Sequence, residues 1–291
     1  MTDRRVPLAF AALVVIWGST WLAIKLGLRD LPPVSFAAYR FVVAALILGA
    51  IVKVRGTKRP ARSDLGVIAV TGFLAFTVNY AALFWGEQHV SAGLAAVLQA
   101  TIPAFGLLVA PLHLPGERIT ARKLTGTLVG IAGVGVVFSD QLHGGGPKAL
   151  WGSAAIVLGA FACAYSNVLV KAKATQVDPG ALALGQMLFG LAPLLVAGLV
   201  LDGSPARLNF TARAVACLLY LALVGSAIAF LLFYWMLQRM EVGKAQLLPL
   251  WTPLVAVLLD TLVLGERVPA GTAVGGATIL VGTAIVVRAR R

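Results

Sequence analysis

Long apolar runs, separated by short polar or charged segments, recur along the whole chain and constrain its fold more than any other feature. They fall near residues 7–27, 34–52, 65–86, 90–112, 122–138, 150–170, 180–201, 214–237, 243–264 and 269–287. A helix of about 20 residues crosses the roughly 30 Å hydrocarbon layer of a bilayer. Lipid offers no partner to backbone N–H and C=O groups, and the alternation typical of barrel strands is absent. The sequence therefore predicts an all-α integral membrane protein with ten transmembrane helices.

The composition agrees with this fold class. Hydrophobic residues make up 59% of the 291 positions and charged residues only 12%, whereas a soluble domain is about half apolar and a quarter charged. The net charge of +13 is also found in nucleic-acid-binding proteins, but here the basic residues lie in short clusters between apolar runs. That placement is typical of orientation signals and of contacts with anionic lipid headgroups. We expect the lipid bilayer, and no nucleic acid, as their partner.

Two local features fit the same interpretation. The N-terminal segment has a basic start and an apolar stretch, as a signal peptide does, but the stretch is too long and no cleavage region follows it. We expect it to be retained as the first span. Cys163 and Cys217 lie inside apolar runs without a CxxC spacing, so neither a disulfide framework nor a metal site is expected, and no cofactor is implied.

Basic residues also predict the orientation. With the N-terminus placed in the cytoplasm, 17 of the 24 Lys and Arg residues fall on the cytoplasmic side and 7 on the other side. Cytoplasmic loops of membrane proteins carry such an excess of Lys and Arg. Removing or adding one span would destroy this bias. We therefore expect a multi-pass protein of the plasma (inner) membrane with both termini in the cytoplasm.

The second half of the chain repeats the first. Gly-Glu-Arg at 116–118 recurs at 265–267, each time after an apolar run. Four further residues recur 150 positions later, Trp85, Gln88, Gly93 and Pro103 as Trp235, Gln238, Gly243 and Pro253; Lys25 and Arg40 correspond to Lys171 and Gln186 at a spacing of 146. We assign residues 1–143 and 144–291 to two five-span repeats. Because five is odd, the second repeat enters the membrane from the opposite side, an architecture widespread among secondary transporters.

Three motifs carry a resemblance to a known family. The first-span IWGSTWLAIKLGL, the YRF of the second span and the GER after spans four and nine resemble the EamA family of the drug/metabolite transporter (DMT) superfamily, over residues 7–287. The resemblance implies two inverted five-helix halves around a cavity lined chiefly by helices one, three, four, six, eight and nine. It also implies export of small metabolites, often amino acids or related compounds, and it does not identify the substrate.

Polar and aromatic residues in the middle of spans are the candidate substrate-binding residues, because such groups must face protein, water or ligand. They are Trp17, Asn79, Tyr80, Gln99, Tyr165, Asn167, Gln246 and Trp251. Their donors, acceptors and flat rings suit a small, partly polar organic molecule. The alternative for each is a hydrogen bond that holds two membrane helices together.

Charged residues and prolines supply further candidates. Asp260 lies inside span nine and is a candidate coupling site for a proton or cation, while Arg40 either binds a substrate carboxylate or serves the structure. Pro103 and Pro253 interrupt corresponding helices and are candidate hinges. Glu117 and Glu266 are expected to stabilise the turn into the following helix.

Other functions remain alternatives. A flippase for lipids or lipid-linked metabolites is the second interpretation. A membrane-embedded enzyme is less favoured, because the three His residues lie at separate span ends and no HExxH or GxSxG motif occurs. A structural subunit is a third alternative. We expect a transporter of a small-molecule substrate, monomeric or homodimeric, and no catalytic residues.

Overall fold

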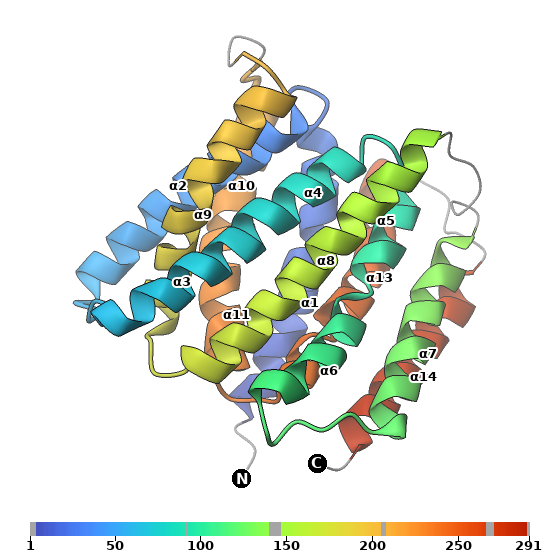
Figure 1. The fold of residues 1–291 in the computed structure, drawn as a ribbon. Coiled ribbons are helices and arrows are strands. Elements are labelled where there is room, and N and C mark those ends of the chain that lie inside the picture. Colours follow the sequence, from blue (N-terminus) through green and yellow to red (C-terminus); the bar gives the residue numbers. More distant parts are fainter. Residues whose placement is uncertain (1–3, 91, 140–146, 205–207, 266–270, 290–291) are drawn as a thin grey trace.

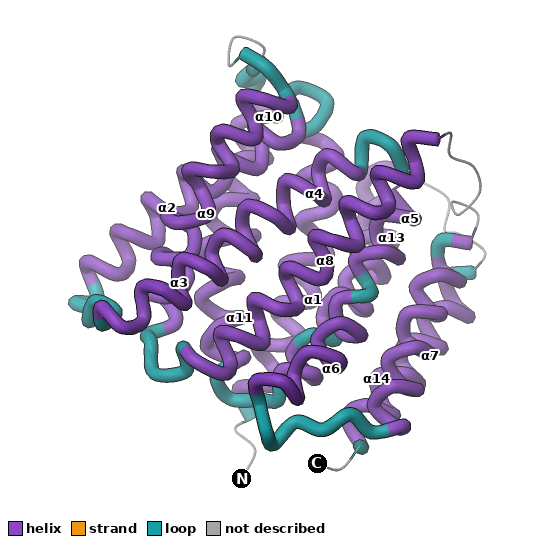
Figure 2. Tube along the Cα trace, in the orientation of Figure 1, coloured by secondary structure: helices purple, strands orange, loops and turns teal. Residues whose placement is uncertain are grey.

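The computed structural model describes residues 4–90, 92–139, 147–204, 208–265 and 271–289, and every regular element in these ranges is helical (Figure 2). Eight of the helical stretches are long and apolar enough to cross a bilayer. Large apolar side chains such as Leu8, Leu46 and Leu262 are about 70% exposed, which suits a surface in contact with lipid rather than water. The prediction of an all-α integral membrane protein is confirmed.

The helices of the first half follow the predicted runs. They are α1 (Arg5–Gly27), α2 (Pro33–Val54), η1 (Arg62–Asp64), α3 (Leu65–Gly72), η2 (Phe73–Val78), α4 (Asn79–Gly86), α5 (Ala92–Gln99), α6 (Ile102–His113) and α7 (Ala121–Val137). The elements from η1 to α4 join without a break into one stretch of 25 residues, Arg62–Gly86. A short interruption separates α5 from α6, just before Pro103 at the start of α6, where a proline is tolerated because that N–H has no helical partner.

The second half has the same order of elements. They are α8 (Pro147–Lys173), α9 (Pro179–Leu201), α10 (Ala212–Ala222), η5 (Leu223–Ile228), α11 (Ala229–Leu237), α12 (Val242–Ala245), α13 (Leu248–Leu264) and α14 (Thr272–Arg288). Helices α7 and α14, with 17 residues each, are shorter than the eight stretches that are long enough to cross a bilayer. In Figure 1, α1 begins and α14 ends at the same end of the bundle; we call it the terminal end and the opposite one the distal end.

Two π-helical segments occupy corresponding places in the two halves. Phe73–Val78 and Leu223–Ile228 each have six residues, and their positions differ by 150, the spacing of the sequence repeat. A π-helical turn holds one more residue than an α-helical turn and occurs frequently at functional sites. Both segments lie near the middle of a long helical stretch, so they mark a region of the bundle that the two halves share.

Glycines bring α7 and α14 into close contact, and the two helices run side by side at one edge of the bundle (Figure 1). A Cβ added to Gly126 would lie 2.7 Å from the Gly282 carbonyl oxygen, and one added to Gly133 would lie 2.8 Å from that of Gly275. Small residues permit such an approach between membrane helices. Gly126 and Gly133 correspond to Gly275 and Gly282 at a spacing of 149. The contact of Gly126 with Gly282 and the contact of Gly275 with Gly133 are therefore corresponding contacts of the two halves.

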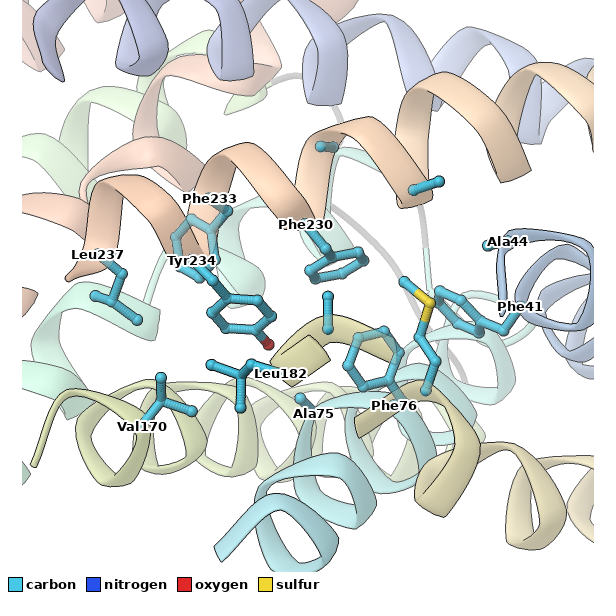
Figure 3. Close-up of a cluster of buried hydrophobic side chains, with 14 of the residues drawn as sticks. Phe41, Ala44, Ala75, Phe76, Val170, Leu182, Phe230, Phe233, Tyr234 and Leu237 are labelled. Carbon is cyan, nitrogen blue, oxygen red and sulfur yellow. The ribbon is translucent and has the colours of Figure 1, made fainter. Parts of the chain in front are cut away.

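Aromatic side chains join the halves in the interior. The Phe76 ring centroid lies 4.8 Å from that of Phe230, and the Trp17 centroid lies 5.2 Å from that of Phe233. Figure 3 shows Phe76 from the first half pointing toward Phe230 and Tyr234 of α11. Such ring pairs stabilise a core beyond their buried area, by about 0.5–1.5 kcal/mol each. The cluster supports one side of the cavity described next.

Candidate functional site

A cavity of about 160 Å³ lies at the centre of the bundle. Its wall is formed by side chains from α1, α2, the η1–α4 stretch, α5, α6, α8, α11, α12 and α13, together with residues that follow these helices. Aromatic groups dominate the wall, namely Trp17, Trp21, Tyr80, Phe84, Phe230, Phe233 and Tyr234. Most small-molecule sites have this character, with a mainly apolar surface and few polar groups that fix orientation.

Most of the predicted site residues line this cavity. Those in the wall are Trp17, Arg40, Asn79, Tyr80, Gln99, Asn167, Gln246 and Pro253. Three others lie elsewhere: Trp251 donates from Nε1 to Thr283 Oγ1 at 3.1 Å, the Tyr165 ring contacts His113 and Phe161, and Pro103 is buried in α6 outside the wall. The side chain of Asp260 lies outside the described residues, so its coupling role stays a prediction.

The wall amides make few hydrogen bonds. Gln99 Nε2 donates to Asn79 Oδ1 at 3.4 Å, and both residues are buried. Gln246 Nε2 donates to the Ala164 carbonyl at 3.0 Å, while its Oε1 is buried and has no partner among the described atoms. Space for the Gln246 amide exists because residue 106 is glycine; a Cβ there would clash with Oε1. The Gln246 amide is therefore packed between α6 and α8, and its unpaired Oε1 costs free energy.

Arg40 forms hydrogen bonds with the second half and also lines the cavity. Its guanidinium donates to Ser226 Oγ at 2.7 Å and to the Gly225 carbonyl at 3.0 Å, and its Cζ lies 5.5 Å from the centroid of Tyr80. Trp17 Nε1 donates to the same Gly225 carbonyl at 3.3 Å. The π-helical segment η5 is thus bonded to two first-half side chains, which ties α1 and α2 to the second half beside the cavity.

Corresponding positions of the two halves line the cavity together. Eight pairs at spacings of 146 or 150 have both members in the wall: Trp17 and Cys163, Trp21 and Asn167, Tyr80 and Phe230, Leu83 and Phe233, Phe84 and Tyr234, Ala96 and Gln246, Gln99 and Pro249, and Ile102 and Thr252. Trp21, which stands near Trp17 in the first span, also lines the cavity, whereas Cys163, Tyr234 and Thr252 were not predicted from the sequence, although the repeat spacing connects each of them to another wall residue. Glu87, which lies in the wall directly after α4, was not predicted either.

At the terminal end, Glu117 bridges the halves. Its carboxylate accepts from the backbone N–H of Val242 at 2.7 Å and of Gly243 at 3.4 Å, at the start of α12. The turn into α7 is instead capped by Thr120, whose hydroxyl accepts from the Lys123 N–H. The expected role of Glu117 in that turn is therefore corrected to a bond between halves, and Glu266 lies outside the described residues.

An ion-pair cluster adjoins this bridge. Lys123 Nζ lies 3.5 Å from a Glu241 carboxylate oxygen, and Lys244 Nζ lies 3.2 Å from the other one. The Lys123 and Glu241 side chains are only 5% and 11% exposed. The bonds from Glu117 and Lys123 both run from the first half to the second, so polar contacts join the two halves at the terminal end.

Together, the apolar outer surface, the long helices and the central cavity define a multi-pass membrane protein with an internal cavity. The model described as the EamA-like transporter family matches residues 5–139 and again residues 150–288. The chain belongs to this family.

The relatives are named as transporters. The chain is 32% identical over 264 residues to the "Uncharacterized inner membrane transporter YedA" of Escherichia coli, covering 89% of this chain and 82% of that protein. It is 30% identical to the "Probable terminal-alkyne amino-acid exporter" of Streptantibioticus cattleyicolor, covering 96% and 92%. It is also 30% identical to the "Probable amino-acid metabolite efflux pump" of Escherichia coli, covering 93% and 90%. A crystal structure at 19% identity shares the fold, with a TM-score of 0.82 and coverage of 98% and 96%.

Proposed function

We propose that this protein is a secondary transporter that exports small metabolites, amino acids or related organic compounds, by opening its central cavity to each side of the membrane in turn. The observation that carries the proposal is the cavity wall, in which eight pairs of corresponding positions from the two halves face one space. In inverted-repeat transporters the substrate site lies at the interface of the repeats. Two relatives named for amino-acid export support the substrate class.

The proposed architecture is ten transmembrane helices in two inverted five-helix repeats, residues 1–143 and 144–291. Four observations support it: the separate family matches to each half, the π-helical segments 150 positions apart, the interchangeable glycine contacts of α7 and α14, and the paired cavity wall. Counting α7 and α14 with the eight longer stretches gives ten spans. The excess of Lys and Arg supports a cytoplasmic location for both termini, hence for the terminal end.

The cavity residues would bind the substrate while the Glu117 bridge and the Lys123–Glu241 pair keep the terminal end closed. Release of these contacts would open the cavity to the cytoplasm. Contacts at the corresponding positions of the second repeat would then close the cavity at the distal end. Exchange of conformation between inverted halves produces alternating access. Pro103 and Pro253, on corresponding helices, are the proposed bending points.

Flux through the purified protein tests the function. Vesicles that contain the protein would be loaded with unlabelled amino acids, cationic drugs or nucleosides and assayed for counterflow of the labelled compound. Replacing Asn79, Tyr80 or Gln99 with Ala should change the apparent affinity for whichever compound moves, and Tyr165→Phe, outside the wall, should not. Unchanged affinity in all three wall variants would remove the proposed pocket. Movement of labelled phospholipid without solute flux would favour a flippase instead.

Labelling of single cysteines tests the architecture. A cysteine placed at Arg118 should react with a membrane-impermeant reagent from the cytoplasmic side, and one at Arg267 from the external side. Both sites follow the same Gly-Glu motif of the two repeats. Reaction of both from the same side would contradict inversion of the repeats.

A further inference from the structure

Glu87 is the carboxylate of the cavity wall. It follows α4 directly, so it is the first residue after the long stretch Arg62–Gly86 and lies at the distal limit of the cavity. Tyr80, Leu83 and Phe84 precede it at helical spacings of seven, four and three, and all of them line the same space. These spacings put the residues on one face of the helix, so Glu87 continues the lining face of α4.

The described residues supply no partner for this carboxylate. Its backbone N–H donates to the Leu83 carbonyl at 2.9 Å, but none of the described side chains forms a hydrogen bond or ion pair with its oxygens. The acids of the terminal end differ, since Glu117 accepts two backbone N–H groups and Glu241 binds two lysines. A carboxylate in an apolar wall is stable when it gains a proton, water or a cationic ligand.

The surroundings favour one kind of cation. Trp21 and Phe84 share the wall with Glu87, and faces of aromatic rings attract organic ammonium groups. The wall also holds Arg40, but its guanidinium is bonded to Ser226 and Gly225 and lies against Tyr80. Tyr80 is two helical turns before Glu87, about 10 Å along the axis, so the two charges lie in different parts of the cavity.

We propose that Glu87 is the cation-binding residue of the central cavity and takes the ammonium group of an amine or amino acid. The inference rests on the proposed transport function and specifies its substrate chemistry. The aromatic residues of the wall enclose the apolar body of the compound, and Gln99 and Gln246 accept or donate the remaining hydrogen bonds. Glu87 thereby selects compounds with an ammonium group over compounds that carry only a carboxylate.

Protonation competes with such a ligand. Burial raises the pKa of the Glu87 carboxyl to about 7. The other titratable groups of the wall are Arg40 from α2, Tyr80 from α4, Cys163 from α8 and Tyr234 from α11, and these residue types ordinarily ionise above pH 8. Between pH 8 and pH 6 the ionised fraction of Glu87 falls from about nine-tenths to about one-tenth, so the affinity for an ammonium compound should fall about ten-fold.

Two neighbouring groups lie outside the wall. His89 contacts the Trp85 ring, with centroids 4.7 Å apart, and ordinarily titrates in the same pH range. Lys25, next to the wall residue Ile24 on α1, is exposed and has its own interaction. His89→Gln is therefore the control that separates the titration of His89 from that of Glu87.

Three compounds with the same phenyl body but different charge test the proposal. Phenethylamine carries an ammonium group, phenylalanine carries both charges and 3-phenylpropionate carries only the carboxylate. Binding to the full-length protein in detergent would be followed by tryptophan fluorescence, since Trp17 and Trp21 line the cavity. We expect phenethylamine and phenylalanine to bind at least ten-fold more tightly than 3-phenylpropionate. Glu87→Gln should remove that preference, and Glu87→Asp should retain part of it.

The pH dependence of phenethylamine binding to the wild-type protein provides a test that does not depend on whether a variant folds. Phenethylamine affinity should fall about ten-fold from pH 8 to pH 6 in the wild type and in His89→Gln, but not in Glu87→Gln. An equal preference for all three compounds, or a flat pH profile in the wild type, would overturn the role of Glu87. If such a protein still moved amino acids in the counterflow assay, the transport function would stand and only the role of Glu87 would fail.

Discussion

Arg40 and Gln186 occupy corresponding positions of the two halves, yet they differ in charge. Arg40 on α2 donates to Ser226 Oγ and the Gly225 carbonyl within the π-helical segment of the second half. Gln186 on α9 donates from Nε2 to Thr71 Oγ1 at 2.7 Å, two residues before the π-helical segment of the first half. Each half therefore sends a polar side chain to the same region of the other half.

The two halves differ in which polar residues line the cavity. Arg40, Asn79 and Glu87 line it, whereas the residues 146 or 150 positions later, Gln186, Ala229 and Leu237, do not. Among the described residues, the two charged side chains of the wall, Arg40 and Glu87, thus come from the first half. Aromatic residues reach the wall from both halves, Trp17, Trp21, Tyr80 and Phe84 from the first and Phe230, Phe233 and Tyr234 from the second, so the halves differ in the charge of their wall residues and not in their aromatic character.

The largest loss of stability is expected from replacing Arg40, the charged residue of the pair Arg40 and Gln186. Arg40→Met removes two hydrogen bonds from a charged donor, worth about 1.5–3 kcal/mol each, whereas Gln186→Met removes one neutral bond worth about 0.5–1.5 kcal/mol. Thermal unfolding in detergent should show the greater loss for Arg40→Met, with Arg40→Gln in between. An Arg40→Met protein as stable as the wild type would indicate that the charge is kept for a ligand and not for the structure.

Equal effects are expected where the two halves are equivalent. Gly126→Ala would bring a Cβ to 2.7 Å from the Gly282 carbonyl, and Gly275→Ala would bring one to 2.6 Å from that of Gly133. Overpacking of this kind costs about 1–3 kcal/mol, so both variants should lower the unfolding temperature by similar amounts. Gly135→Ala is the control, because a Cβ there meets no atom within 4 Å. Destabilisation by only one of the pair would show that the halves do not contact each other symmetrically.

Helical periodicity explains which parts of the site could be predicted from sequence. Asn167 and Gln246 line the cavity, but the predicted Tyr165 and Trp251 do not. At 100° per residue, Tyr165 lies 200° from Asn167 on α8, so the two residues do not share a helix face. Gln246 follows α12 and Trp251 lies within α13, so the helical period does not relate these two residues. Composition identifies the spans, and the repeat identifies the paired helices, but only the packed structure identifies the lining face.

The roles of charged residues at helix ends could not be predicted from the sequence. A carboxylate just after a span, such as Glu87 or Glu117, matches the ordinary pattern of an interfacial group. The sequence cannot indicate that Glu117 reaches α12 across the repeat boundary, 125 residues away, or that Glu87 faces inward. Both depend on how the helices pack, which no local pattern encodes.

A smaller effect is expected from the Glu117 bridge. Glu117→Gln keeps the shape but removes the charge beside the N–H groups of α12, worth about 0.3–1 kcal/mol. That change corresponds to a two- to five-fold shift in an opening equilibrium. In a Cys217→Ala background, alkylation of the wall residue Cys163 from the cytoplasmic side should accelerate by this factor. Asp64→Asn, at an exposed acid of the same end, should leave the rate unchanged, and an unchanged rate in Glu117→Gln would exclude the bridge as a closure.

The smallest effect is expected at the distal end, where the bond between halves is exposed. Asp30 accepts from Arg213 at 2.8 and 2.9 Å and from Thr211 at 2.7 Å, but the Arg213 side chain is 45% exposed. The hydrogen bond from Arg213 holds the pKa of Asp30 below its ordinary value. The stabilisation is therefore present above about pH 4 and is lost as the pH falls through the lowered pKa.

Asp30→Asn should accordingly shift the unfolding temperature less than any change above, and less again at high salt, because water and ions screen an exposed pair. The difference from the wild type should vanish in acid. Arg213→Gln is the matched control, because it removes the same bond from the other residue. A loss as large as that of Arg40→Met would mean that the distal contact, and not the bond beside the cavity, holds the halves together.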